Sequence, residues 1–193
     1  LRIFILGIFI YWLSALLNVY FLGAFSMLFI ITGLILYFYG LEFLRALIFP
    51  ISFLIFMIPL PLIFISFISF NLKIIAAQLA VHILNFLNIK AVIHASLIQL
   101  PHSEVIVENA CGGLKSLISL TALGALFAYQ MKLKFSKKII LFLSAIPIAG
   151  LTNTIRIVFL ALVGEFYGTE YAQPEHLLHS LSGFAVFILA FLM

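Results

Sequence analysis

Residues 108–129, ENACGGLKSLISLTALGALFAY, decide the fold, because a short polar segment passes directly into a long apolar run. The run Leu114–Tyr129 has the composition of a helix, and Asn109 has the side chain of a helix N-cap. The apolar character continues through the chain, since 66% of its 193 residues are hydrophobic and only 8% are charged. Soluble domains carry roughly 25% charged residues, so the composition excludes a soluble fold.

The apolar runs predict an all-α, polytopic transmembrane helical bundle. A membrane barrel would need alternating segments of about ten residues, whereas these runs are continuous and approach the roughly 20 residues of a membrane-crossing helix. We expect one domain, 1–193, with about six spans. The expected spans are residues 3–22, 25–39, 41–58, 114–129, 139–163 and 176–193. The chain begins Leu1-Arg2 and stops inside an apolar run, so we expect a piece of a longer protein that lacks its native termini.

Two segments between the third and fourth spans have a different pattern. In residues 71–88 the polar side chains recur at helical spacing, which predicts an amphipathic helix in the outer membrane interface or one that lines a polar cavity. These side chains are Asn71, Gln78, His82 and Asn85. Residues 89–107 mix β-branched and polar side chains, which predicts a short extended, hairpin-like segment with its turn at Pro101-His102-Ser103.

The positive charge predicts the orientation. Four lysines cluster in residues 131–138, namely Lys132, Lys134, Lys137 and Lys138. The positive-inside rule places this loop in the cytoplasm, and counting spans back puts Arg2 and Arg45 on the same side. Residues 71–113 and 164–175 then face the exterior or periplasm. Because the net charge of +4 is concentrated at this one loop, we expect membrane lipids and no nucleic acid as partners.

Cys111 is the only cysteine, so it forms no intrachain disulfide. If Asn109 opens the helix, Cys111 lies in its first turn, where free N–H groups and the helix dipole favour a thiolate. Lys115, four residues later, adds positive charge on the same helical face. The local pattern fits a nucleophile and a small residue at a helix contact equally well.

Arg156 lies within an expected span, roughly 25 Å along the axis from its inner end. A charged side chain inside the membrane costs at least about 2.5 kcal/mol and therefore marks a functional site by default. The alternatives are that Arg156 extends to the outer headgroups, or that it pairs with Glu165 or Glu108. Asn153, three residues earlier, lies on the same face, so this face should point to protein or water.

His176 and His179 open the last span and share a helical face. Gly183, one turn beyond His179, would let another helix approach closely. A single histidine in such a place is more often structural than catalytic. The topology nevertheless brings a cysteine, an arginine and a histidine to one depth on the outer side. A thiolate can attack a peptide carbonyl, an imidazole can transfer protons, and a guanidinium can stabilise the oxyanion.

Other chemistries fit the sequence less well. Cys111, His176 and His179 would supply three zinc ligands, but no fourth ligand has the usual spacing, so we expect neither a metal nor a cofactor. The chain has no Gly-x-Ser-x-Gly, no His-Glu-x-x-His and no aspartate, which argues against serine, zinc and aspartyl intramembrane proteases. The alternative from another class is a non-enzymatic transporter or substrate-binding membrane subunit. It would carry polar residues at mid-membrane depth in several helices.

Three motifs resemble the exosortase/archaeosortase family of membrane cysteine transpeptidases. That family typically has Ala-Cys-Ser-Gly-Leu-Arg-Ser, then Asn-x-x-Arg-Ile, then His-x-x-x-Gly, and this chain has corresponding motifs at residues 110–116, 153–157 and 179–183. Residues 56–61 and 145–149 are also similar to the family. Gly112 stands where the family has serine, and Lys115 stands where it has arginine.

The resemblance implies that Cys111 is the nucleophile, Arg156 the catalytic arginine and His179 the catalytic histidine. Supporting or substrate-binding roles are then expected for four further residues: Glu108, Lys115, Asn153 and His176. The implied substrates are surface proteins whose C-terminal tail combines a short motif such as Pro-Glu-Pro, a transmembrane helix and a basic end. The family also implies a multi-pass protein of the plasma or inner membrane, with its active site facing the exterior or periplasm.

Overall fold

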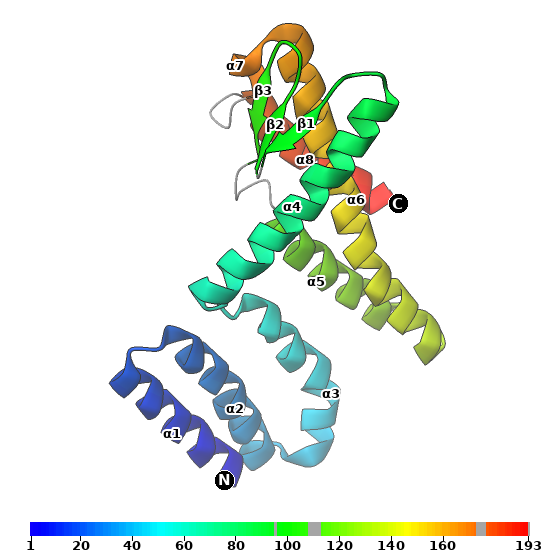
Figure 1. The fold of residues 1–193 in the computed structure, drawn as a ribbon. Coiled ribbons are helices and arrows are strands. Elements are labelled where there is room, and N and C mark those ends of the chain that lie inside the picture. Colours follow the sequence, from blue (N-terminus) through cyan, green and yellow to red (C-terminus); the bar gives the residue numbers. More distant parts are fainter. Residues whose placement is uncertain (95, 108–112, 173–176, 193) are drawn as a thin grey trace. The chain divides into compact units, whose positions relative to one another are not determined.

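A computed structural model describes residues 1–94, 96–107, 113–172 and 177–192, without the side chains of 177–180 and 191. The chain forms two compact units, Leu1–Phe64 and Ile65–Met193. Almost all of the described structure is helical, with one small sheet in the second unit (Figure 1). The predicted all-α membrane fold is therefore confirmed.

The first unit contains α1 (Arg2–Leu17), α2 (Tyr20–Phe38), α3 (Gly40–Phe53) and the 3-10 helix η1 (Leu54–Met57). The helices α1 and α2 pack side by side (Figure 1). Glycines allow this, because a Cβ on Gly33 would lie 2.5 Å from the backbone nitrogen of Phe4. The predicted first span was too long: α1 ends at Leu17, and Asn18 turns the chain with a left-handed φ of 54°.

The second unit contains most of the helix α4 (Leu62–Phe86), followed by the strands β1 (Val92–His94), β2 (Leu97–Gln99) and β3 (Glu104–Ile106). The helices α5 (Leu114–Gln130), α6 (Phe135–Tyr167), α7 (Thr169–Ala172) and α8 (Leu177–Leu192) follow. The strands pair in the order β1-β2-β3, antiparallel throughout. The extended segment predicted for residues 89–107 is thus a three-stranded sheet. At its predicted turn, the amide of Leu100 donates to the carbonyl of Ser103 over 2.9 Å.

The expected amphipathic helix at residues 71–88 is one part of the longer helix α4, which starts at Leu62. The helix starts earlier than predicted because the residues between Pro61 and Asn71 are mostly apolar. They continue the helix directly after the break at Pro59 and Pro61. The polar stripe predicted from the sequence is exposed on α4. The opposite face is built of small residues and is buried against the sheet and α6. The side chains of this core include Ala77, Ala80, Leu84, Ile98, Val105, Ile157 and Ala161.

The sheet lies against the C-terminal part of α6, where Gly164 leaves room for it. A Cβ on Gly164 would lie 3.2 Å from a methyl group of Val105. The predicted loop 164–175 is shorter than expected, because α6 continues to Tyr167 and α7 follows. The chain is continuous through Pro147 as one 33-residue helix. Such a helix is roughly 50 Å long, which exceeds the hydrocarbon thickness of about 30 Å.

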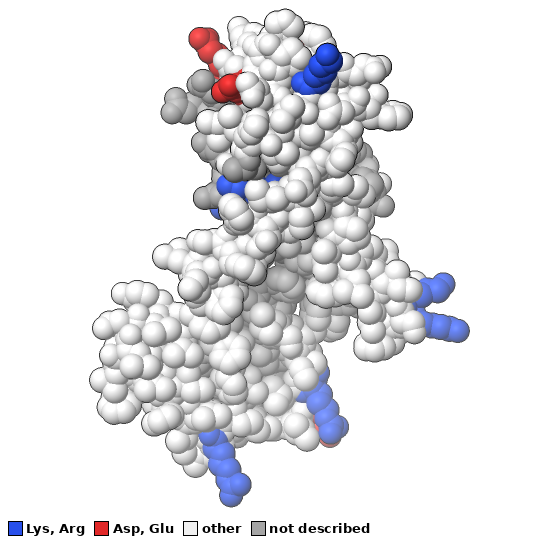
Figure 2. Space-filling view, viewed as in Figure 1, with Lys and Arg blue, Asp and Glu red and all other residues white. Residues whose placement is uncertain are grey.

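Within the described residues, four helical segments are long and apolar enough to cross a membrane. They are Tyr20–Phe38, Gly40–Met57, Leu62–Phe86 and Phe135–Tyr167, and the apolar segments Arg2–Leu17 and Leu181–Ala190 are shorter. Large hydrophobic side chains are widely exposed on both units. Figure 2 shows a face that is mostly uncharged, with basic side chains where α6 begins. This surface is that of a multi-pass membrane protein.

Candidate active site

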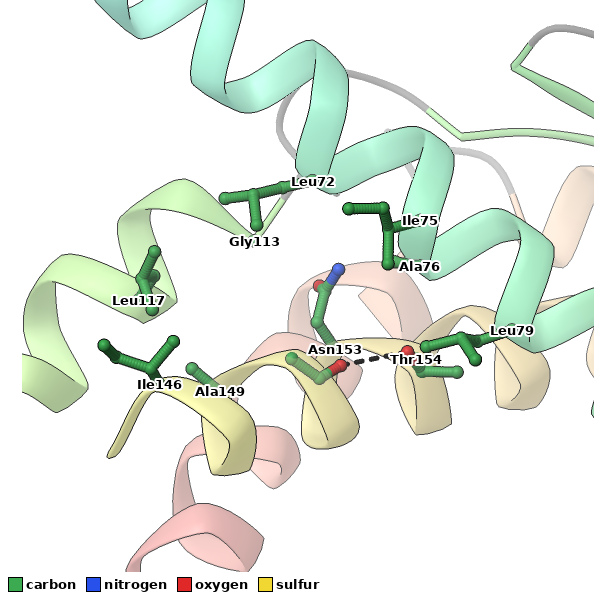
Figure 3. Close-up of a pocket in the computed structure, with 11 residues that line it drawn as sticks. Leu72, Ile75, Ala76, Leu79, Gly113, Leu117, Ile146, Ala149, Asn153 and Thr154 are labelled. Carbon is green, nitrogen blue, oxygen red and sulfur yellow. Dashed lines mark hydrogen bonds between the residues drawn. The ribbon is translucent and has the colours of Figure 1, made fainter. Parts of the chain in front are cut away.

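The side chain of Asn153, on α6, contacts the residue that precedes α5. Its side chain is buried, with a relative exposure of 3%. The nearest part of the neighbouring segment is Gly113, the N-cap of α5, whose φ is 74°. A Cβ on Gly113 would lie 3.0 Å from both Cγ and Nδ2 of Asn153. The backbone at Gly113 therefore packs directly on the asparagine side chain, and both residues line the pocket drawn in Figure 3.

Arg156 lies almost one helical turn after Asn153 on α6, and its side chain contacts α8. Its Nε donates a hydrogen bond to the hydroxyl of Ser182 over 3.2 Å. The guanidinium also lies against Gly183, since a Cβ there would be 3.4 Å from a terminal nitrogen. The neighbour for which Gly183 leaves space is thus the arginine predicted to be catalytic. His179 precedes Gly183 by four residues in the same helix, and its side chain lies outside the described part of the structure.

Glu165, one of the acids considered as a partner of Arg156, binds elsewhere. Its carboxylate accepts hydrogen bonds from the backbone amide of His102 over 3.1 Å and from the hydroxyl of Ser103 over 3.2 Å. The other carboxylate oxygen lies 2.7 Å from Nδ1 of His102. Glu165 therefore fastens the β2–β3 turn to the end of α6.

A cavity of about 70 Å³ lies where α4, α5 and α6 meet, and Asn153 is at its polar end (Figure 3). Its wall is otherwise apolar: Leu72, Ile75, Ala76 and Leu79 come from α4, Leu117 from α5, and Ile146, Ala149 and Gly150 from α6. Gly113 and Thr154 complete the lining beside Asn153. The hydroxyl of Thr154 donates its proton to the carbonyl of Gly150 over 2.9 Å, within α6.

Several predicted site residues fall outside the described residues, namely Glu108, Cys111 and His176. The zinc set Cys111, His176 and His179 is likewise beyond the described side chains. Lys115 lies in the first turn of α5 and is exposed. The helix predicted for residues 114–129 is α5, whose first described residues are the N-cap Gly113 and Leu114. Asn109 as a helix N-cap and Cys111 in a first helical turn are predictions that lie outside the described residues.

Lys73 of α4 is a buried cation that the sequence analysis missed. Its relative exposure is 8%, and its Nζ lies 5.5 Å from the centroid of the Phe70 ring. The signal was available, because a charged residue inside an apolar run marks a functional site as directly as Arg156 does.

The model of the transmembrane exosortase family matches residues 1–193, which is the whole chain. Neither the comparison with curated proteins nor the comparison with solved structures gives a match. Membership of this family supports a membrane transpeptidase of the sorting type. The chain, with its apolar helices and its three exosortase-like motifs, belongs to the transmembrane exosortase family.

Proposed function

We propose that this chain is a cysteine transpeptidase that cleaves C-terminal sorting signals at the outer face of the membrane. One observation supports it above the others: a single stretch of α6 contacts the segments of both other motifs. Asn153 packs against Gly113, two residues after Cys111, and Arg156 bonds to Ser182, three residues after His179. Consecutive Cα atoms are about 3.8 Å apart, so the Cα of Cys111 lies within about 7.6 Å of that of Gly113.

The proposed reaction begins with attack of the Cys111 thiolate on the carbonyl carbon of the scissile peptide bond. The carbonyl oxygen takes up the negative charge of the tetrahedral intermediate, and the Arg156 guanidinium stabilises it. When the C–N bond breaks, the His179 imidazolium gives its proton to the leaving amine. The remaining acyl group is a thioester on Cys111. An incoming amine, lipid or water then attacks the thioester carbonyl carbon and loses its proton to the imidazole, and the C–S bond breaks to release the Cys111 thiolate.

The contacts of the described residues suggest supporting roles. Asn153 is buried against Gly113 and would hold the backbone of the Cys111 segment. Ser182 accepts from Nε of Arg156 and would fix the plane of the guanidinium. Lys115 is exposed at the start of α5, where it can meet a substrate. Glu108 and His176 remain proposals from the sequence.

The substrates would be surface proteins with a tripartite C-terminal tail. A site near the outer end of α6 suits a peptide bond just outside the substrate's own membrane helix. Arg156 is 21 residues beyond the start of α6 at Phe135, which is roughly 32 Å along the axis. The cleavage position would thus lie close to the outer edge of a hydrocarbon layer about 30 Å thick.

The test is processing of a co-expressed protein with such a tail, followed by the size of the product. Cys111→Ala, Arg156→Ala and His179→Ala should each abolish processing, because each removes one of the proposed reacting groups. Ser182→Ala should reduce the rate by about tenfold, as expected for a lost hydrogen bond to a charged group. Retained processing by the cysteine variant would overturn the proposal.

Two matched controls distinguish a loss of catalysis from a loss of folding or membrane insertion. Arg45 of α3 and His94 of β1 are exposed. Neither residue belongs to any of the three sequence motifs of the proposed site. Arg45→Ala and His94→Ala should therefore leave processing within about twofold of the wild type. Membrane insertion of every variant is measured in parallel, so that a missing product reflects catalysis.

A further inference from the structure

The strand β3 forms one edge of the small sheet. The strands pair in the order β1-β2-β3, so β2 is the one strand that pairs with β3 in the described part of the chain (Figure 1). Glu104 and Ile106 of β3 are exposed, and Ile106 has a relative exposure of 66%. Proteins often protect a free edge from other chains with a lysine, a proline or a bulge. β3 contains none of these.

The pairing with β2 determines which backbone groups of β3 point outward. The amide of Val107 donates a hydrogen bond to the carbonyl of Ser96 over 2.8 Å. Opposed residues in an antiparallel pair alternate between bonded and non-bonded positions, so Val105 also bonds to β2. The amides and carbonyls of Glu104 and Ile106 therefore point away from β2. Within the described residues these outward groups have no backbone hydrogen bond.

β3 runs from the C-terminal end of α6 toward the proposed active site. It begins after the turn that Glu165 holds, and it packs against Gly164. The chain that follows β3 reaches Gly113, which packs on Asn153. Arg156 precedes Gly164 by eight residues in α6, which is roughly 12 Å along the axis. About four residues of an extended chain cover this distance, so a peptide that lies along β3 can reach the arginine.

We propose that the outer edge of β3 binds the segment of the substrate that precedes its membrane helix, as an added parallel strand. The inference rests on the proposed function, which supplies this substrate. The unpaired amides and carbonyls of an edge strand are complementary to an extended peptide backbone. In the predicted orientation the substrate passes the site from the exterior into the membrane, which is also the direction in which β3 runs. The added strand is therefore parallel to β3.

Parallel pairing defines the hydrogen bonds of the complex. One substrate residue lies opposite Val105, donates its amide proton to the carbonyl of Glu104 and accepts a hydrogen bond from the amide of Ile106. The substrate residues before and after it direct their amides away from β3, so prolines fit at both positions. Such a short strand offers few bonds. The membrane helix of the substrate compensates for this, because it holds the segment beside the site at a high effective concentration.

The experiment measures binding of a synthetic tail peptide to the full chain in detergent micelles by fluorescence anisotropy. The labelled peptide contains Pro-Glu-Pro, an apolar helix and a lysine-rich end, and the Cys111→Ala background prevents its cleavage. Ile106→Pro removes the outward amide but keeps the bond between Val107 and Ser96, as is tolerated at an edge. It should raise Kd about five- to tenfold, the effect of one lost hydrogen bond.

Two further variants show whether the amide itself is responsible. Ile106→Ala keeps the amide and shortens the side chain, so Ile106→Pro should bind at least about threefold more weakly than Ile106→Ala. Ile93 of β1 lies opposite Ile98, which bonds to β3, so its amide points outward at the other edge of the sheet. Ile93→Pro should therefore keep Kd within about twofold. Equal affinities for the two Ile106 variants, or equal losses for the two proline variants, overturn the inference.

A second measurement applies if Ile106→Pro fails to insert. The tail peptide should then slow hydrogen exchange in residues 104–107 of the Cys111→Ala chain about fivefold or more, and unchanged exchange overturns the inference. Peptide binding does not require the thiol. If Cys111→Ala abolishes processing but the two Ile106 variants bind equally, only the role of β3 fails. If Cys111→Ala retains processing, the proposed function itself fails.

Discussion

At Gly113 the backbone is left-handed, with φ of 74°, and a Cβ would lie only 3.0 Å from the side chain of Asn153. A non-glycine residue in this conformation costs about 1–2 kcal/mol, and the Cβ would also press on Asn153. We predict that Gly113→Ala lowers the midpoint of thermal unfolding by about 2–8 °C, on the scale expected for a chain of this length. Circular dichroism in detergent would measure the shift.

Gly150 supplies the control for this prediction. It lies inside α6, and an added Cβ would have no heavy atom within 4 Å. Gly150→Ala should therefore keep or raise the unfolding temperature, because alanine is favoured over glycine in a helix by up to about 1 kcal/mol. Equal unfolding temperatures for Gly113→Ala and Gly150→Ala would contradict the packing of Gly113 on Asn153.

Gly113 and Gly150 also show what the sequence can predict about a single residue and what it cannot. Gly113 stands where a polar segment meets an apolar one and Gly150 stands inside an apolar run, but the sequence does not show which of them has a neighbour where a Cβ would be. At Gly113, the N-cap of α5, the left-handed backbone packs on Asn153, a contact between residues 40 positions apart that no local pattern predicts. The cost of a charge in the membrane predicts a functional role for Arg156, and the same rule applies to Lys73, which is buried on α4.

Among the elements, the small sheet is held at its β2–β3 turn by the carboxylate of Glu165. Glu165 of α6 accepts hydrogen bonds from His102 and Ser103 in the β2–β3 turn. We predict that Glu165→Ala frees this turn and raises the hydrogen-exchange rate of residues 100–104 by about tenfold or more, because a charged hydrogen bond contributes about 1.5–3 kcal/mol. Exchange measured by mass spectrometry would report it.

Glu170 of α7 is the matched control, since it is an exposed acid close to Glu165 in the sequence. Glu170→Ala should leave exchange in residues 100–104 unchanged. If the two variants give the same exchange pattern, the carboxylate of Glu165 does not fasten the turn.

The elements could be predicted where composition alone decides them. Long apolar runs predicted the helices, and Pro101 with its neighbours predicted the turn of the hairpin. The ends of the helices were harder to predict from the sequence. Gly23 falls in the predicted break between the first two spans, but it faces Ser14, where a Cβ would lie 2.9 Å from the hydroxyl oxygen. The contact between His102 and Glu165 joins residues 63 positions apart, and no local pattern predicts such a pair.

For the whole molecule, the orientation predicted by the positive-inside rule places the sheet and the four-lysine segment on opposite sides of the membrane. They belong to opposite ends of α6 in the second unit. In a Cys111→Ala background, Glu104→Cys should react with an impermeant maleimide in intact cells. Ser136→Cys should react only after permeabilisation. Both positions are exposed, so the reverse pattern would show that the positive-inside assignment is wrong.

The central claim is that Cys111 carries the acyl group of a cleaved substrate. The most direct measurement is mass spectrometry of the full-length chain, isolated from cells that express a tailed substrate and quenched in acid. We predict a substrate fragment attached to the peptide that contains Cys111, released by neutral hydroxylamine as expected for a thioester and missing in Cys111→Ala. Cleaved substrate together with an unmodified Cys111, or an acyl group on any other residue, would contradict the account.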